Sequence, residues 1–220
     1  MILYEIFGTE HHPVYQNLEI ANGARQYDFL HSLVHTALAV QRLFLSTHLI
    51  KALNHQAITC LHVSAGEFRP CEVVVGQHRP PEHYRVQALM DDFINAANRA
   101  WESTDPITLA AYVMWRLNWI HPFINSNGRT ARAASYFVLC AKLNRWLPGT
   151  TILPELLRRE RVRYVKALAT ADAMAVAGQP NFLDDLANLI AELLAEQLGI
   201  TPPPGAAPAP LPPALPAPTP

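Results

Sequence analysis

Residues 121–132 constrain the fold more than any other stretch, because they predict a helix end, a short loop and a new helix within twelve residues. They read His-Pro-Phe-Ile-Asn-Ser-Asn-Gly-Arg-Thr-Ala-Arg. Pro122 disfavours helical backbone angles at the residue before it, so the preceding apolar helix should end at His121. A turn-rich loop then leads to Asn127-Gly128, where a second helix should begin. His121 is therefore expected at the mouth of a loop, beside a helix N-terminus.

The first turn of that second helix has the properties of an anion site. A helix N-terminus presents unpaired N–H groups and the positive end of the helix dipole, and Gly128 lets a phosphate approach the backbone closely. Arg129 and Arg132 lie on nearly one face, and two guanidinium groups suit a di- or triphosphate. His121 can accept a proton near neutral pH. The combination favours attack of a hydroxyl group on a nucleotide phosphate.

Each feature also has a purely structural interpretation, in which His-Pro ends a helix, Asn-Ser-Asn-Gly forms a turn and both arginines are solvated. We favour the functional interpretation because all of these features occur in order within twelve residues. The sequence contains no Gly-x-x-x-x-Gly-Lys-Ser/Thr pattern, so the predicted phosphate site is not a P-loop.

The segment resembles the Fic signature, His-Pro-Phe-x-Asp/Glu-Gly-Asn-Gly-Arg-x-x-Arg. Weaker similarity extends over roughly residues 45–198. Ala65–Pro70 and Val73–Gly76 resemble the family's flap region, and the stretch from Tyr164 to Phe182 resembles helices that close its nucleotide pocket. The resemblance implies an all-α fold, a Fic-like helical domain with a short β-hairpin flap.

By this resemblance the chain is a protein adenylyltransferase, a nucleotidyltransferase that moves AMP from ATP to a Ser, Thr or Tyr hydroxyl of a target protein with Mg²⁺. His121 would be the general base. The residues that the resemblance assigns to the nucleotide are Asn127, Gly128, Arg129, Arg132 and Tyr164. Those it assigns to a flap that docks the target by strand addition are Phe68, Val73, Val74 and Val75.

Two positions depart from the signature. Asn125 stands where an acidic residue commonly holds Mg²⁺, so it is the expected metal position with a neutral, weaker ligand. Ser126 replaces the usual glycine and tolerates fewer backbone conformations. These changes keep two alternatives open: transfer of another moiety, such as UMP, phosphate or phosphocholine, and a weakly catalytic nucleotide-binding interaction module.

Regulation of the known Fic type is not expected. The family's inhibitory motif is Ser/Thr-x-x-x-Glu-Gly/Asn, and no Glu in this chain is followed by Gly or Asn. Substitution of Arg132 should therefore disable the enzyme rather than release it. An inhibitory partner protein and a homo-oligomer both remain open as regulators.

The rest of the sequence predicts one helical domain with appendages. Helical patterns cover about residues 25–44, 46–62, 81–101, 105–120, 127–146, 154–176 and 182–198. The basic run Arg158–Arg163 is expected to be a solvated helix face. We divide the chain into an N-terminal helical extension packed on the core (1–45), a Fic-like domain (46–199) and a disordered Pro/Ala-rich tail (200–220).

Composition and charge bear on the partners and the cellular compartment to be expected for the protein. The net charge of −1 argues against a general nucleic-acid binder, so no nucleic-acid partner is expected. Three widely spaced cysteines indicate a reducing compartment rather than a disulfide framework. No apolar stretch is long enough to cross a membrane, and we expect a cytoplasmic protein whose partners are ATP and a target protein.

Overall fold

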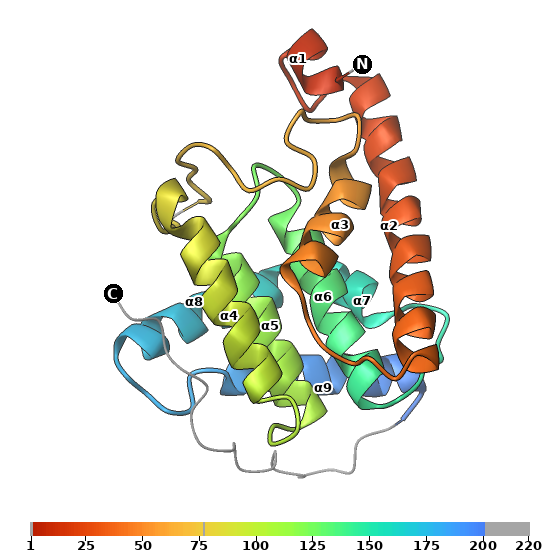
Figure 1. Cartoon of the computed structure of the whole chain (residues 1–220), viewed down its shortest axis with the longest axis vertical. Helices are drawn as coiled ribbons and strands as arrows, with labels where there is room; N and C mark the ends of the chain where they lie inside the picture. Colours follow the sequence, from red (N-terminus) through yellow and green to blue (C-terminus); the bar gives the residue numbers. More distant parts are fainter. Residues whose placement is uncertain (1, 77, 201–220) are drawn as a thin grey trace.

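The computed structural model describes residues 2–76 and 78–200. The elements, in chain order, are α1 (Leu3–Phe7), α2 (Pro13–Ala39), α3 (Thr47–Ile58), the 3₁₀ helix η1 (His83–Arg85), α4 (Val86–Arg99), α5 (Pro106–Ile120), α6 (Asn127–Lys142), α7 (Leu153–Arg159), α8 (Arg161–Val176) and α9 (Asp184–Leu198). The helical fold class is confirmed (Figure 1). The predicted disordered tail, residues 201–220, lies outside the described residues.

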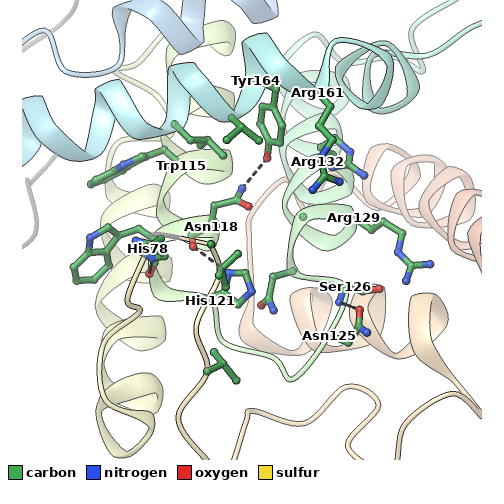
Figure 2. A pocket seen from close by; sticks show the side chains of 18 of the residues that line it. His78, Trp115, Asn118, His121, Asn125, Ser126, Arg129, Arg132, Arg161 and Tyr164 are labelled. Atoms are coloured by element: carbon green, nitrogen blue, oxygen red, sulfur yellow. Dashed lines mark hydrogen bonds between the residues drawn. The ribbon is translucent and has the colours of Figure 1, made fainter. Parts of the chain in front are cut away.

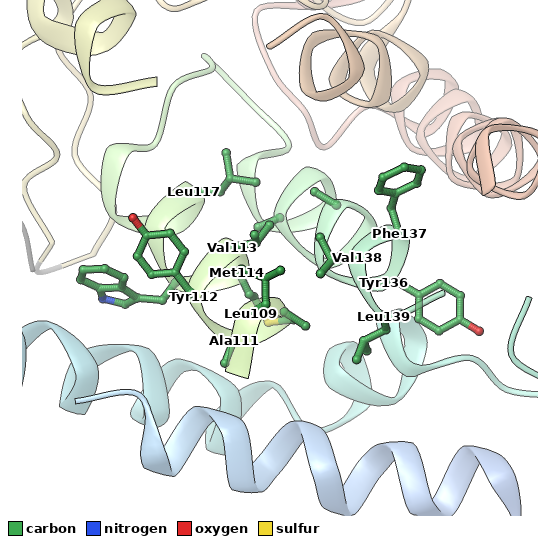
Figure 3. Packing of buried hydrophobic residues seen from close by; sticks show 14 of the residues in the cluster. Leu109, Ala111, Tyr112, Val113, Met114, Leu117, Tyr136, Phe137, Val138 and Leu139 are labelled. Carbon is green, nitrogen blue, oxygen red and sulfur yellow. The ribbon is translucent and has the colours of Figure 1, made fainter. Parts of the chain in front are cut away.

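Helices α5 and α6 form the centre of the molecule. α5 is buried around most of its circumference, as a helix surrounded by other helices must be. α4, α8 and α9 pack against α5, whereas α2, α3 and α7 pack against α6. Figure 3 shows the contact between the two central helices, where Leu109, Val113 and Val138 are among the buried side chains. This packing fixes both ends of the loop that contains residues 121–126.

Two predicted helix starts are confirmed by their capping hydrogen bonds. The Asp105 carboxylate accepts from the backbone N–H groups of Ile107 and Thr108, each at 3.0 Å, ahead of Pro106 in the first turn of α5. The Ser46 hydroxyl accepts from Leu49 N–H at 3.1 Å at the start of α3. Local capping chemistry therefore sets where the helix leading to the site begins.

Other predicted helix boundaries were wrong. α2 begins at Pro13 rather than near residue 25, because His12 accepts a capping hydrogen bond from Val14 N–H at 3.2 Å. The third predicted helix begins at Val86 after η1, so Pro81 is outside it. The helix predicted over residues 154–176 is divided at Glu160, whose backbone angles (φ −85°, ψ 32°) leave the helical region.

The predicted hairpin at Phe68–Val75 is an irregular loop, which we call the flap loop (residues 68–76 and 78). Its described residues form two isolated bridges, Val75 with His78 and Phe68 with Phe123. Phe68 thus pairs with the loop after α5 rather than with another flap strand. The neighbouring Arg69 side chain is 2% exposed and donates from Nε to the His121 carbonyl at 2.9 Å. These contacts attach the flap loop to the segment that contains His121.

The N-terminal residues pack on the rest of the molecule. Leu3 and Tyr4 donate their N–H groups to the carbonyls of Cys60 and Leu61 at 2.9 and 3.0 Å. α2 runs beside α3 and α6 (Figure 1), and the fully buried Tyr15 belongs to a small apolar cluster beneath it. Among the described helices, none has the combination of length and apolar character needed to span a membrane.

Candidate active site

A pocket of about 1110 Å³ lies where the end of α5, the following loop and the start of α6 meet. α8 and the flap loop form two of its walls, and residues of the N-terminal segment reach its edge (Figure 2). The predicted site residues that line it are His121, Asn125, Asn127, Gly128, Arg129, Arg132, Tyr164, Val73, Val74 and Val75. Phe68 is not among its lining residues, because it packs on Phe123 with ring centroids 5.7 Å apart.

His121 ends α5 in a left-handed backbone conformation (φ 51°, ψ 58°), which is unusual for a residue other than glycine. Its N–H donates to Leu117 O at 3.0 Å, and Arg69 holds its carbonyl. This turn directs the imidazole into the pocket, as Figure 2 shows. Nδ1 lies 3.3 Å from the Asn118 carbonyl oxygen, which can only accept, so Nδ1 carries the proton and Nε2 has the free lone pair.

Burial lowers the pKa of His121 from 6.5 to about 4, and the Asn118 carbonyl opposes this shift only in part. The imidazole is therefore neutral near pH 7. A neutral ring with a free Nε2 lone pair can remove a proton from a hydroxyl group placed beside it.

This pKa shift predicts how stability depends on pH. The folded state binds a proton at His121 only near pH 4, whereas the unfolded state does so near 6.5. The unfolded state therefore holds more protons between these values, and the free energy of unfolding should fall as pH falls through this window. The loss attributable to His121 is on the order of 1–3 kcal/mol. Urea titrations at pH 7 and pH 4.5 should show a smaller decrease for His121→Asn than for the wild type; equal decreases would contradict the prediction.

The loop before α6 is stabilised by its own amide side chains. Asn127 donates from Nδ2 to Phe123 O at 2.8 Å and accepts from Phe123 N–H at 2.9 Å. Its side chain thus shapes the loop, which leaves its backbone N–H for the predicted anion site. At Gly128 an added Cβ would lie 3.3 Å from Arg132 Nη1, so glycine leaves room beside that guanidinium. Ser126 adopts a left-handed conformation (φ 61°) without a side-chain capping bond.

The two signature arginines differ in their surroundings. The Arg132 guanidinium lies 5.9 Å from the centre of the Tyr164 ring, and no ion pair joins it to a carboxylate within residues 2–76 and 78–200. Burial lowers its pKa, yet a guanidinium stays charged near neutral pH. Arg129 Nη2 instead contacts Glu19 Oε1 of α2 at 2.8 Å. A partly buried, unneutralised guanidinium beside a helix N-terminus favours binding of an anion.

The amide oxygen of Asn125, the expected metal position, is already engaged in a hydrogen bond. Oδ1 accepts from the backbone N–H of Ser126. Nδ2 donates to Glu10 Oε1 at 2.6 Å and lies 3.2 Å from His62 Nε2. The anionic oxygen nearest this position in the structure therefore comes from Glu10, in the turn between α1 and α2.

Several pocket residues were not predicted from the sequence as site residues. On α8 they are Arg161, Val165, Ala169 and Asp172, which share one face with Tyr164 and Leu168 at helical spacing. Arg158 at the end of α7 also lines the pocket. The expected solvated basic face is confirmed, since all four of its arginines are exposed, and Arg159 and Arg163 pair with Glu196 and Glu192. The periodicity of α8 was the signal that could have located this wall.

The part of the pocket formed by α8 and the flap loop contains a second polar group. Asp172 Oδ1 accepts from Trp115 Nε1 at 2.8 Å, and Asp172 Oδ2 lies 3.7 Å from His78 Nδ1 of the flap loop. Burial raises the pKa of Asp172, while the Trp115 hydrogen bond opposes the shift. Asn118 of α5 donates to Tyr164 Oη of α8 at 2.8 Å, and this hydrogen bond joins the two helices. These contacts hold α5, α8 and the flap loop around one end of the pocket (Figure 2).

Comparison with known proteins identifies the family. Residues 44–139 match the model of the Fic/DOC family. The protein adenylyltransferases Fic of Drosophila persimilis and Drosophila melanogaster are 42% and 41% identical to the chain over 71 residues. That match covers 32% of this chain but only 14% of each fly protein.

Solved structures show the same fold. A Fic domain containing signaling protein from Bacteroides thetaiotaomicron aligns with a TM-score of 0.64 at 19% identity, over 90% of this chain and 80% of that one. Fic-1 (residues 134–508) from C. elegans aligns with a TM-score of 0.61 at 23% identity, over 82% of this chain and 50% of that one. The helical fold, with a pocket at the start of its central helix, is that of a Fic domain. Residues 44–139 of the chain thus match the Fic/DOC family, and the described residues share the fold of solved Fic domains.

Proposed function

We propose that the protein is an adenylyltransferase that transfers AMP from ATP to a Ser, Thr or Tyr hydroxyl group of a target protein. The observation that carries the proposal is the position of His121 in one pocket with the N-terminus of α6 and the partly buried Arg132. A base and a phosphate-binding turn in the same pocket are what attack of a hydroxyl group on a phosphate requires. Relatives named protein adenylyltransferase support AMP as the transferred group.

Each residue then has a defined task. His121 Nε2 accepts the proton of the attacking hydroxyl group. The backbone N–H groups at Asn127 and Gly128 bind the phosphates, and Arg132 stabilises the charge that builds up on the leaving pyrophosphate. Tyr164 and the apolar face of α8 enclose the base of the nucleotide.

The target segment would approach along the flap loop. Val74 and Val75 are 69% and 41% exposed, and Val73, Val74 and Val75 line the pocket. Exposed main chain at the edge of a site can pair with an extended segment in a manner that tolerates many sequences.

A divalent cation such as Mg²⁺, when bound with the triphosphate, would neutralise phosphate charge and orient the leaving group. The donor set in the structure fits such an ion. Hard cations prefer carboxylate and carbonyl oxygens, and the partly exposed Glu10 carboxylate, which accepts from Asn125 Nδ2, lies at the pocket.

The direct test is an intact-mass measurement. The wild-type protein is incubated with single nucleoside triphosphates, Mg²⁺ and cell lysate, and every modified protein is weighed. A mass gain equal to AMP, seen with ATP alone, is the expected result. A mass gain equal to UMP, phosphate or phosphocholine would instead show that the protein uses another donor or transfers another group. Nucleotide binding without any adduct would contradict the transferase assignment and favour a nucleotide-binding interaction module.

A further inference from the structure

A glutamate from outside the signature loop occupies the place beside Asn125. Glu10 lies in the turn between α1 and α2 and is 115 residues away from Asn125 in the sequence. In the structure, however, Glu10 Oε1 lies 2.6 Å from Asn125 Nδ2. The Glu10 side chain is 48% exposed and lines the pocket that contains His121 and Arg132. The carboxylate is therefore open to the space where the phosphates would bind.

Neighbouring groups fix which way the Asn125 amide points. Its oxygen, Oδ1, accepts from the backbone N–H of Ser126, and its nitrogen, Nδ2, donates to Glu10 Oε1 at 2.6 Å. The reversed amide would place its oxygen against the Glu10 carboxylate. Asn125 accordingly acts as a hydrogen-bond donor that holds Glu10.

The two glutamates at the pocket are not equivalent. Glu19 is paired with Arg129 at 2.8 Å. Glu10 forms no ion pair with a lysine or arginine among the described residues, although its charge acts on Arg129 from a longer distance. Its carboxylate is thus less neutralised than that of Glu19.

A second observation indicates a ligand at this place. Ser126, the next residue, lines the same pocket and is 9% exposed. Its Oγ has no hydrogen-bond partner within the described part of the chain. Buried hydroxyl groups are nearly always hydrogen-bonded, so an unpartnered one at the pocket points to a group that completes the site.

We propose that Glu10 supplies the carboxylate ligand for the divalent cation that enters with the nucleotide, and that Asn125 positions Glu10 for this role. The inference rests on the proposed nucleotide-binding function. The carboxylate that the signature usually provides at position 125 would here come from the N-terminal segment. An aspartate at position 125 would repel Glu10, so the asparagine in the loop and the glutamate in the turn belong together.

The test measures binding of ATP by calorimetry, first in EDTA and then with saturating Mg²⁺, with Mn²⁺ paramagnetic resonance as a direct reading of bound metal. The variants are Glu10→Gln, the exchanged pair Glu10→Gln with Asn125→Asp, and the control Glu102→Gln, whose exposed side chain is outside the pocket. Circular dichroism melting checks that every variant is folded.

In Glu10→Gln, ATP affinity in EDTA should be retained, while the gain from Mg²⁺ falls by about tenfold or more, as is usual when a partner of a metal site is lost. The exchanged pair keeps one carboxylate and one amide and should restore the gain and the Mn²⁺ signal. An unchanged gain in Glu10→Gln, or no recovery in the exchanged pair, would overturn the assignment of Glu10. Absence of ATP binding by the wild type in EDTA would instead contradict the proposed function itself, and the metal site with it.

Discussion

His121→Ala should lower the rate of AMP transfer by about 10²–10⁴-fold, the usual contribution of a general base. The imidazole is partly buried and neutral at the end of α5, with Nδ1 against the Asn118 carbonyl. Nε2 is therefore free to accept a proton from the attacking hydroxyl group. Because the phosphate-binding turn and Arg132 remain in place, ATP affinity should change little.

Single-turnover transfer and equilibrium ATP binding should be measured on the same preparation. His35→Ala is a suitable control, since His35 is exposed on α2 and contacts His31 rather than the pocket. A His121→Ala protein that transfers AMP at the wild-type rate would remove His121 from the mechanism. Loss of ATP binding together with activity would instead assign it to the nucleotide site.

Arg132→Ala should also lower the rate of AMP transfer, by a factor on the order of 10³. This is the lower range for an arginine that stabilises charge on transferring phosphates. The side chain is largely buried and stacks on Tyr164, with no carboxylate paired to it in the described residues. A positive charge held in this way is free to bind phosphate. Unlike His121→Ala, this variant should also bind ATP more weakly.

Two further variants sharpen the test of Arg132. Arg132→Lys keeps the charge but not the planar two-pronged donor geometry, so its activity should lie between wild type and Arg132→Ala. Arg163→Ala removes an exposed arginine whose partner is Glu192 on α9 and should leave transfer unchanged. Increased activity in Arg132→Ala would show that this arginine takes part in restraint rather than catalysis.

The sequence predicted the loop between α5 and α6 because its determinants are local. Asp105 and Pro106 begin α5 and Pro122 ends it, so the placement of His121 beside the start of α6 follows from neighbouring residues. The left-handed conformations of His121 and Ser126 were not predicted, since neither is a residue that favours them. They depend on buried contacts of the loop, such as the Arg69 bond to the His121 carbonyl.

The parts that sequence reasoning missed depend on long-range contacts. Glu10 and Glu19 reach the pocket only because α2 packs along α3 and α6, and no local pattern distinguishes them from other exposed glutamates. The flap was expected to pair with itself, but Phe68 finds its partner in Phe123. The residues assigned to Mg²⁺, ATP and the target remain predictions until they are measured.

The position of α2 has a consequence for how this protein can be divided. The matched Fic/DOC segment begins at residue 44, yet the ion pair on Arg129 and the carboxylate beside Asn125 come from Glu19 and Glu10. A fragment that starts at residue 44 would retain the whole signature loop. It would also expose the face of α3 that α2 covers and remove both acidic groups at the pocket edge. The smallest unit with a complete site is thus larger than the smallest unit with a recognisable sequence.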